Sequence, residues 1–134
     1  MKEHTILIIG AGPAGLETAY QLKSLGLRPI IIERNDKIGG HLAQWDRLFP
    51  SSEEANELLE RLKEQVKDVE IKLNSRISSI EKEGEIFHVT LTNNKTYDVS
   101  AVVLCTGFDL FKKKKKQEYG YGIYNNVITN AELE

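Results

Sequence analysis

Cysteine is almost missing from this chain, with Cys105 as the single example among 134 residues. One cysteine cannot form an intrachain disulfide, and no Cys-x-x-Cys motif is present to exchange electrons or to hold zinc or an iron–sulfur cluster. We therefore expect no metal site. Any redox chemistry must come from a bound cofactor.

Long apolar runs and an excess of positive charge are missing too. No run approaches the ~20 residues that a membrane-spanning helix needs, so we predict no membrane span. The N-terminal Met-Lys-Glu-His lacks the apolar stretch of a secretory signal, which makes the cytoplasm the expected compartment. The formal net charge is −2. Because nucleic-acid affinity rests on a broad basic surface, we expect no nucleic-acid partner, and only Lys112–Lys116 is locally basic.

Residues 5–15 combine an apolar run with three glycines, Gly10, Gly12 and Gly15. The run predicts a buried strand, and the residues from 13 to about 25 predict a helix directly after it. At such a strand-to-helix turn, Gly10 permits a tight turn and Gly12 leaves room for a pyrophosphate beside the backbone. Gly15 lets the helix lie close to the strand. The free N–H groups of the helix N-terminus would then face the anion.

A second apolar run, residues 28–33, ends in the carboxylate of Glu33. The order strand, helix, strand predicts a right-handed βαβ unit with a parallel sheet. At the end of the second strand, a carboxylate can accept hydrogen bonds from both ribose hydroxyls of a nucleotide, and it disfavours a 2′-phosphate. The alternative is that Glu33 simply ends the strand in solvent.

Residues 34–50 form a long irregular segment of the kind that runs over a ligand or a partner. Its pair Gly39-Gly40 indicates close backbone approach. His41 is either a hydrogen-bond donor to a cofactor or an ordinary surface histidine. Trp45 is interpreted as a packing residue rather than a stacking platform.

A second helix is predicted after Ser51-x-x-Glu54, which has the spacing of a capping box. Glu57 and Arg61 are expected on its solvated side. A third strand, over residues 69–73, would extend the parallel sheet. The apolar stripe of the helix consists of Ala55, Leu58, Leu59, Leu62 and Val66.

From residue 76 the pattern changes to three short strands with tight turns, residues 77–82, 86–92 and 96–99, which predict an antiparallel meander. The run from Ala101 to Cys105 then predicts a central strand buried on both faces, with Cys105 as a small buried hydrophobe. The strand ends in Thr106-Gly107. Because ligands bind outside the carboxyl ends of parallel strands, Thr106 and Gly107 should reach the same crevice as the glycine motif.

The predicted fold class is therefore α/β, a Rossmann-like βαβ parallel sheet with an antiparallel β-meander crossover, in one domain over residues 1–134. The glycine motif, Glu33 with Gly39-Gly40, the meander and Thr106-Gly107 together resemble the FAD-binding domain of two-dinucleotide-binding-domain flavoproteins, the disulfide reductase superfamily. Residues 39–50 and 119–129 resemble, more narrowly, the flavin-carrying subunit of heterodisulfide reductase.

The resemblance implies FAD as the cofactor and an electron-transferring flavoprotein oxidoreductase as the parent protein. Glu33 would bind the adenosine ribose, residues 39–44 would run toward the ribityl chain, and Ile77 would approach the adenine. Arg34 would cover the adenine face or stay exposed. No catalytic residue is indicated, because neither a dithiol nor a general base is apparent. The candidate cofactor-binding residues are Gly10, Ala11, Gly12, Pro13, Ala14, Gly15, Glu33, Arg34, Gly39, Gly40, His41, Gln44, Ile77, Thr106 and Gly107.

Two departures from the resembled families change the expectation. The flavin-carrying subunits of heterodisulfide reductases commonly have a cysteine-rich stretch after the Phe-Pro, whereas Phe49-Pro50 leads here toward a helix. The superfamily also has a second dinucleotide domain and a returning segment that completes the flavin site. We therefore expect this chain to be part of a longer flavoprotein, to hold FAD weakly or to purify without it, and to be inactive alone. Its partners would be FAD and the remaining domains or redox subunits.

Two other functions stay open at this stage. The same glycines and Glu33 could serve an NAD-binding module of a dehydrogenase, although Gly39-Gly40 and the meander count against it. A non-enzymatic interaction domain could use Lys112–Lys116, although such runs usually lie on solvated loops. No pattern in the sequence indicates an oligomeric state.

Overall fold

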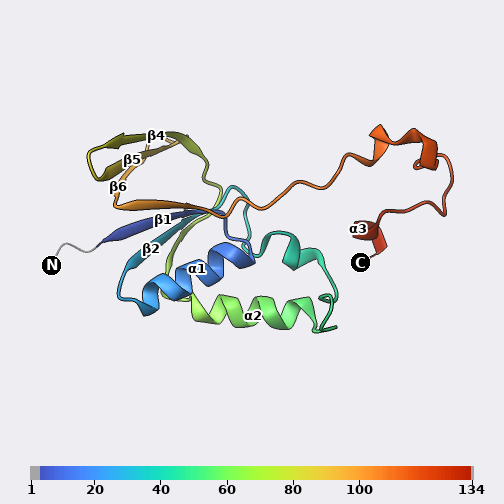
Figure 1. Ribbon diagram of the computed structural model, residues 1–134, viewed down its shortest axis with the longest axis horizontal. Coiled ribbons are helices and arrows are strands. Elements are labelled where there is room, and N and C mark those ends of the chain that lie inside the picture. Colours follow the sequence, from blue (N-terminus) through green and yellow to red (C-terminus); the bar gives the residue numbers. More distant parts are fainter. Residues whose placement is uncertain (1–3, 134) are drawn as a thin grey trace.

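The computed structural model describes residues 4–133, and its centre is a four-stranded parallel sheet in the order β3-β2-β1-β7. Two long helices cover one face of this sheet, and a second, antiparallel sheet of order β4-β5-β6 covers the other, as Figure 1 shows. This three-layer arrangement confirms the predicted α/β class with its β-meander crossover. The parallel strands are β1 (Thr5–Ile9), β2 (Arg28–Ile32), β3 (Glu70–Lys72) and β7 (Ala101–Leu104).

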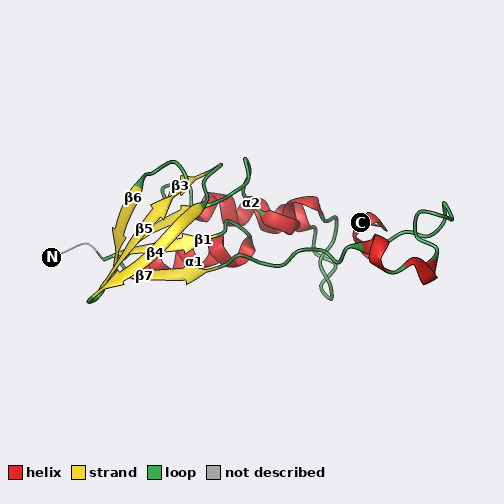
Figure 2. Ribbon diagram, turned by 90° about the horizontal axis from the view of Figure 1, so that it is seen from above, coloured by secondary structure: helices red, strands yellow, loops and turns green. Residues whose placement is uncertain are grey.

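The helices on the first face are α1 (Pro13–Ser24) and α2 (Ala55–Gln65). The antiparallel strands are β4 (Ile77–Glu83), β5 (Ile86–Leu91) and β6 (Thr96–Val99). Shorter elements complete the chain: η1 (Gly40–Gln44), η2 (Lys113–Lys115), η3 (Gln117–Tyr119) and α3 (Asn130–Leu133). Figure 2 separates the strands of the two sheets from the helices by colour.

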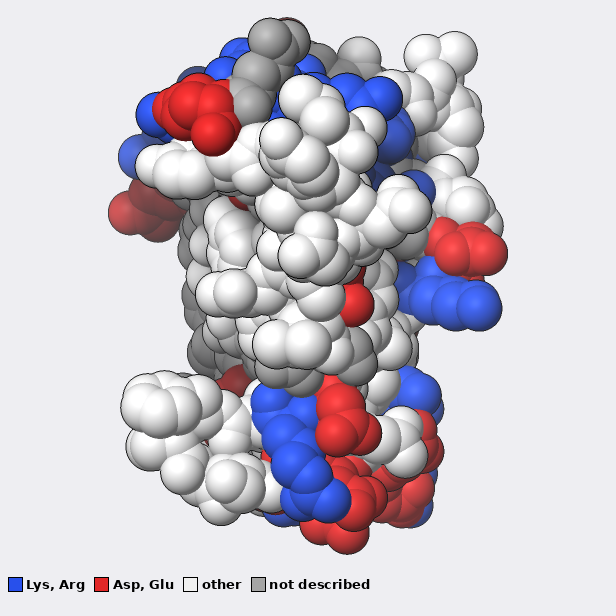
Figure 3. Space-filling model, turned by 90° about the vertical axis from the view of Figure 1, so that its right-hand side faces the viewer, with Lys and Arg blue, Asp and Glu red and all other residues white. Residues whose placement is uncertain are grey.

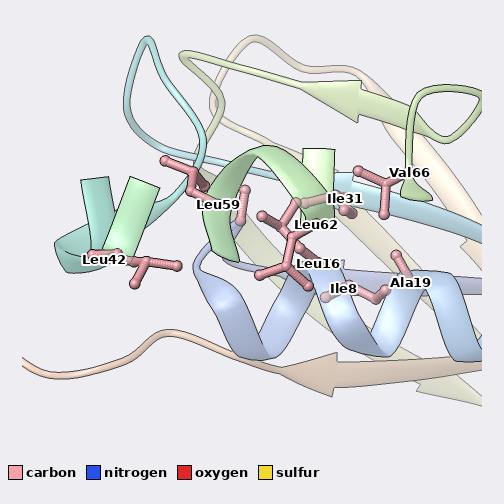
Figure 4. Packing of buried hydrophobic residues seen from close by; sticks show 10 residues of the cluster. Ile8, Leu16, Ala19, Ile31, Leu42, Leu59, Leu62 and Val66 are labelled. Atoms are coloured by element: carbon pink, nitrogen blue, oxygen red, sulfur yellow. The ribbon is translucent and has the colours of Figure 1, made fainter. Parts of the chain in front are cut away.

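The last four residues of β1 and of β2 are apolar because both faces of these strands are covered. Ile8 and Ile31 point toward the helices, where they join Leu16 of α1 and Leu62 of α2 in one buried cluster (Figure 4). The intervening residues of the two strands point the other way. Leu7, Ile30 and Ile32 pack against Val89, Leu91 and Val99 of the meander. Both faces are thus removed from water, as for parallel strands in general.

The ends of α1 carry the proline and glycine typical of helix ends, whereas the start of α2 differs from the prediction. α1 has Pro13 in its first turn, and Gly26, with φ of 75°, lies just beyond its C-terminus. The predicted capping box at Ser51 is wrong, because Glu54 is the N-cap residue of α2 and no side chain caps it. The Ser51 hydroxyl instead accepts a bond from the Glu53 backbone at 3.3 Å.

Glu57 and Arg61 lie on the exposed side of α2 as predicted, and Arg61 forms an ion pair with Glu53 at 3.1 Å. One further expectation is corrected. The strand from Ala101 is not central. Within the described residues β7 pairs only with β1 and is the edge of the parallel sheet, which leaves Leu104 70% exposed.

After β7 the chain leaves the two sheets and runs away from them, carrying η2, η3 and α3 at its far end (Figures 1 and 2). Residues 110–133 are called the arm below. No helix in the described part of the chain combines the length and the apolar character required to cross a bilayer.

The first prediction concerns packing at the β1–α1 turn. A Cβ at Gly15 would lie 1.9 Å from the Gly10 carbonyl oxygen, whereas a Cβ at Gly12 meets nothing within 4 Å. Gly15→Ala should destabilise the protein by about 3 kcal/mol, although alanine is favoured over glycine in a helix by about 1 kcal/mol. Gly12→Ala is the matched control and should leave the urea midpoint unchanged. Equal midpoints for the two variants would contradict the close approach.

The second prediction concerns pH. The hydrogen bond from His88 to the Asp98 carboxylate, 2.7 Å long, raises the pKa of His88 above 6.5, and the charge of Glu83 adds to this. Because the folded pKa is higher than the unfolded one, this contribution to stability is complete below 6.5 and is lost as the pH rises through the raised value. The difference in unfolding free energy between wild type and His88→Gln, measured by urea unfolding at a series of pH values, should therefore decrease as the pH rises above 6.5. His4→Gln, which removes another exposed histidine, should show a smaller change; a flat difference for His88→Gln would refute the linkage.

Candidate functional site

The carboxyl ends of β1, β2 and β7 open into one cleft of about 1220 Å³. Its floor is the turn between β1 and α1, and its walls are residues 33–38, η1 with Trp45, the start of β4 and the segment after β7. The strand order explains the convergence, since the ends of parallel strands meet at one edge of the sheet. A cavity of this size lies above the usual range for drug-sized ligands, roughly 300–1,000 Å³, and suits a ligand as large as a dinucleotide.

Gly10 holds the floor of the cleft together. Its φ is 107°, and an added Cβ would lie 2.2 Å from the Cys105 carbonyl oxygen. Its N–H donates to the carbonyl of Ile32 at 2.8 Å, so this one residue connects β1 to the ends of β2 and β7. Only glycine satisfies both the backbone conformation and the close approach.

Gly12 differs from the other glycines of the motif. Its φ of −73° and ψ of −179° are available to any residue, and open space surrounds the position where a Cβ would stand. It is also the N-cap residue of α1, with no side chain capping the helix. The N–H groups of the first turn lack acceptors within the helix and form an anion-binding end. The protein's own packing therefore does not require glycine here.

The pair Gly39-Gly40 packs against this floor. Gly39, with φ of 111°, donates its N–H to the Ala11 carbonyl at 2.7 Å. A Cβ on Gly40, with φ of 55°, would lie 3.3 Å from the Gly12 Cα. The glycine pair thus brings the start of η1 close to the uncapped end of α1.

Glu33 is buried, with 5% of its surface exposed, so the alternative of a carboxylate ending the strand in solvent is wrong. One carboxylate oxygen accepts the Ala11 N–H at 2.7 Å, and the other accepts the Asn35 N–H at 2.8 Å. Each oxygen keeps a further lone pair, and Glu33 also lines the cleft. The side chain therefore fixes two loops and can still accept a bond from a ligand.

Charged side chains stand at the rim near the end of β2. Arg34, Lys37 and Arg76 line the cleft together with Asp36. Arg34 is exposed and lies 3.5 Å from the Asp109 carboxylate, an ion pair that solvent weakens. The three cations make this end of the cleft suitable for a ligand that carries negative charge.

The opposite wall carries aromatic rings. The His41 ring is stacked with Phe108, with centroids 4.8 Å apart, and with Trp45 at 6.1 Å. His41 Nε2 also lies 2.8 Å from the Phe108 carbonyl oxygen. Trp45 packs against the core as predicted, but it lines the cleft as well. His41 therefore connects η1 to the segment after β7, rather than lying free on the surface.

The structure brings most of the predicted site residues to the cleft and places three of them behind its wall. Ala11 and Gly15 are buried, and Gly39 lies under Leu59. The predicted residues that line the cleft are Gly10, Gly12, Pro13, Ala14, Glu33, Arg34, Gly40, His41, Gln44, Ile77, Thr106 and Gly107.

Several lining residues were missed. Ser75, Arg76 and Thr92 reach the cleft because the chain re-enters the sheet edge at β4, and Phe108 reaches it through its ring stack with His41. A search of the residues just before the meander would have found Ser75 and Arg76, since they follow a parallel strand. Phe108 carried no such signal. Cys105 is half-buried rather than buried as predicted: it packs against the core on one side and lines the cleft on the other.

No group of three His, Cys, Asp or Glu side chains within residues 4–133 could hold a metal ion.

Comparisons with known proteins agree with this geometry. A ferredoxin–NADP reductase of Picrophilus torridus is 31% identical over 127 residues, which cover 86% of this chain and 38% of that relative. The crystal structure of L-proline dehydrogenase from P. horikoshii matches 78% of this chain and 22% of that one, with 27% identity and a TM-score of 0.67. OTEMO in complex with FAD and NADP shares the fold, with 20% identity over 78% of this chain and 26% of that one and a TM-score of 0.60.

The chain thus spans less than half the length of these similar proteins. Residues 1–134 match the family model described as pyridine nucleotide-disulphide oxidoreductase over their whole length. The glycine turn and the buried Glu33, which meet at one cleft, agree with this match. The match shows that the chain belongs to the pyridine nucleotide-disulphide oxidoreductase family.

Proposed function

We propose that this chain supplies the ADP-binding half of the FAD site in a flavoprotein oxidoreductase. Family membership supports an oxidoreductase that binds a dinucleotide, and the similar OTEMO structure was solved with FAD and NADP. Because the chain covers 38% of its ferredoxin–NADP reductase relative, the activity of the whole protein would need further segments.

The arrangement at Gly12 is the observation that carries the proposal. A glycine without any conformational or packing need, at an uncapped helix N-terminus, faces a large cleft. A phosphate that approaches the backbone of this turn would account for the missing side chain, the uncapped helix N-terminus and the open space in front of both. The residues present therefore fit the pyrophosphate of a dinucleotide.

The other roles follow from position along the cleft. Backbone N–H groups of the first turn of α1 would bind the pyrophosphate, and Glu33 would accept a bond from the adenosine ribose. Ile77 offers an apolar surface and Arg34 a planar cation for the adenine. The segments at Gly40, His41 and Gln44, and at Thr106 and Gly107, would enclose the ligand beyond the pyrophosphate. When bound, the flavin supplies the electron-transfer chemistry.

Glu33 favours a free ribose hydroxyl over a 2′-phosphate. Its carboxylate is buried and keeps a lone pair on each oxygen, so a hydroxyl donor gains a charge-assisted bond. A 2′-phosphate would bring a second anion against it. This supports FAD, or NAD as the second candidate, over an NADP-type adenosine at this position.

A parent protein similar to the flavin-carrying subunit of heterodisulfide reductase is the finer proposal. Its support is the sequence of residues 39–50 and 119–129, which resembles that subunit. The second stretch makes a tight local fold, in which Gly120 is buried under the Tyr124 ring. That likeness supports a role in passing electrons to other redox subunits. The proposed compartment is the cytoplasm.

The third prediction tests the ribose contact. Glu33→Gln should weaken ADP binding about tenfold, because a charge-assisted hydrogen bond is worth about 1.5–3 kcal/mol. Wild type should bind ADP more tightly than 2′-deoxy-ADP in calorimetry, and the variant should lose this preference. Asp36→Asn is the matched control, since it removes the same charge from a neighbouring exposed carboxylate at the cleft. Unchanged discrimination in Glu33→Gln would remove the assigned role.

The fourth prediction separates FAD from NAD. The isolated chain should bind FAD and ADP with similar, weak affinity, because it holds only the ADP half, and NADH should not bind more tightly. A version extended to the length of its relatives should bind FAD much more tightly and show a flavin absorption spectrum. Preferential binding of NADH would support the dehydrogenase module instead. Gly12→Ala should weaken FAD and ADP alike, at unchanged stability.

A further inference from the structure

Lys112–Lys116 play no part in the nucleotide site, whose lining ends at Phe108. They lie on the arm, where η2 forms an exposed turn away from the two sheets (Figure 1). The arm carries five lysines against two carboxylates, Glu118 and Glu132, whereas the whole chain has a net charge of −2. Positive charge is therefore concentrated in this one segment.

Two of the five lysines serve the fold of the arm. Lys113 pairs with Glu132, and its ammonium lies 4.7 Å from the centre of the Tyr121 ring. Tyr121 and Thr129 also donate hydrogen bonds to the Glu132 carboxylate. The bond from Lys113 makes the largest contribution, and together these bonds lower the pKa of Glu132 to about 2. Lys116 pairs with Glu118 at 3.4 Å.

The remaining three lysines project without such partners. In the part of the chain that the structure describes, Lys112, Lys114 and Lys115 are exposed and form no ion pair. Figure 3 looks onto this end of the molecule and shows basic side chains at the top of the view, above an uncharged area. Leu110 and Phe111 directly precede them and are 47% and 65% exposed.

From this arrangement we propose that the arm binds an anionic lipid surface, with Lys112, Lys114 and Lys115 against the headgroups and Leu110 and Phe111 inserted between them. Each cation near an anionic lipid surface contributes about 1 kcal/mol to such attraction. Apolar side chains beside the cations add burial in the interface. The proposed contact is peripheral, because it places only two apolar side chains in the interface.

The chemistry of the segment favours a lipid surface over a folded acidic protein. All five cations are lysines, which act as hydrated point charges and lack the planar fork with which arginine pairs bidentately with a carboxylate or phosphate. Lysine is also depleted from protein–protein interfaces, whereas it suits diffuse attraction to a layer of charge.

The fifth prediction is measured by co-sedimentation with vesicles. The 134-residue chain should bind vesicles of phosphatidylcholine mixed with phosphatidylserine, and not vesicles of phosphatidylcholine alone. Replacing Lys112, Lys114 and Lys115 with glutamine should weaken binding about a hundredfold, since each lysine contributes about fivefold. High salt should do the same, because the Debye length falls to about 3 Å at 1 M. Phe111→Ser, which keeps the charge, should weaken binding less.

A control of equal charge replaces Lys23, Lys63 and Lys67, which form ion pairs on the body of the protein, and it should bind vesicles like wild type. Equal binding to both vesicle types, or equal loss in the control, would overturn the proposal. So would selective binding to polyglutamate or RNA in place of vesicles, which would indicate an acidic protein or a nucleic acid. ADP affinity should be the same in all these variants, so this test is independent of the nucleotide proposal.

Discussion

Backbone-to-backbone contact at Gly10 and Gly15 is the constraint on which the rest of the structure depends. Gly10 joins the end of β1 to the ends of β2 and β7, and Gly15 lets α1 begin directly against the same turn. A side chain at either position would collide with main-chain oxygen atoms, which cannot move without separating strands from helix. Because α1 is fixed this closely, its uncapped N-terminus faces the cleft, and α2 can pack beside it over Ile8 and Ile31.

Glu33 makes the second connection, and it does so with charge rather than with close packing. Its buried carboxylate accepts one backbone N–H from the β1–α1 turn and one from the turn after β2. The two walls of the cleft are therefore held by the same side chain that faces it. Structural and ligand-binding roles coincide here, because an ionised carboxylate has more acceptor positions than the protein uses. Because the carboxylate is buried, a hydrogen bond from a ligand to one of its remaining acceptor positions is stronger than the same bond in water.

The molecule divides into a packed part and an extended part. Residues up to β7 bury two apolar clusters on the two faces of one sheet, whereas the arm is held by polar contacts around Glu132 and by the turn at Gly120. Strand β7 stands at the sheet edge, with Leu104 exposed. The sequence of β7 is as apolar as that of β1, and its composition therefore predicted a strand buried on both faces. Within the described residues, nothing covers its outer edge.

The sequence by itself determined the order of elements, the turn glycines and the convergence of Glu33 with Thr106-Gly107, because apolar periodicity, glycine spacing and the parallel βαβ rule are local or topological properties. Only the tertiary structure decided which glycine is free of packing, because the atoms that a Cβ would meet at Gly12 or Gly15 are set by how strand and helix pack. It also decided that Glu33 is buried and that His41 meets Phe108. Each of these depends on atoms brought together from distant parts of the chain, and no pattern of neighbouring residues records such contacts.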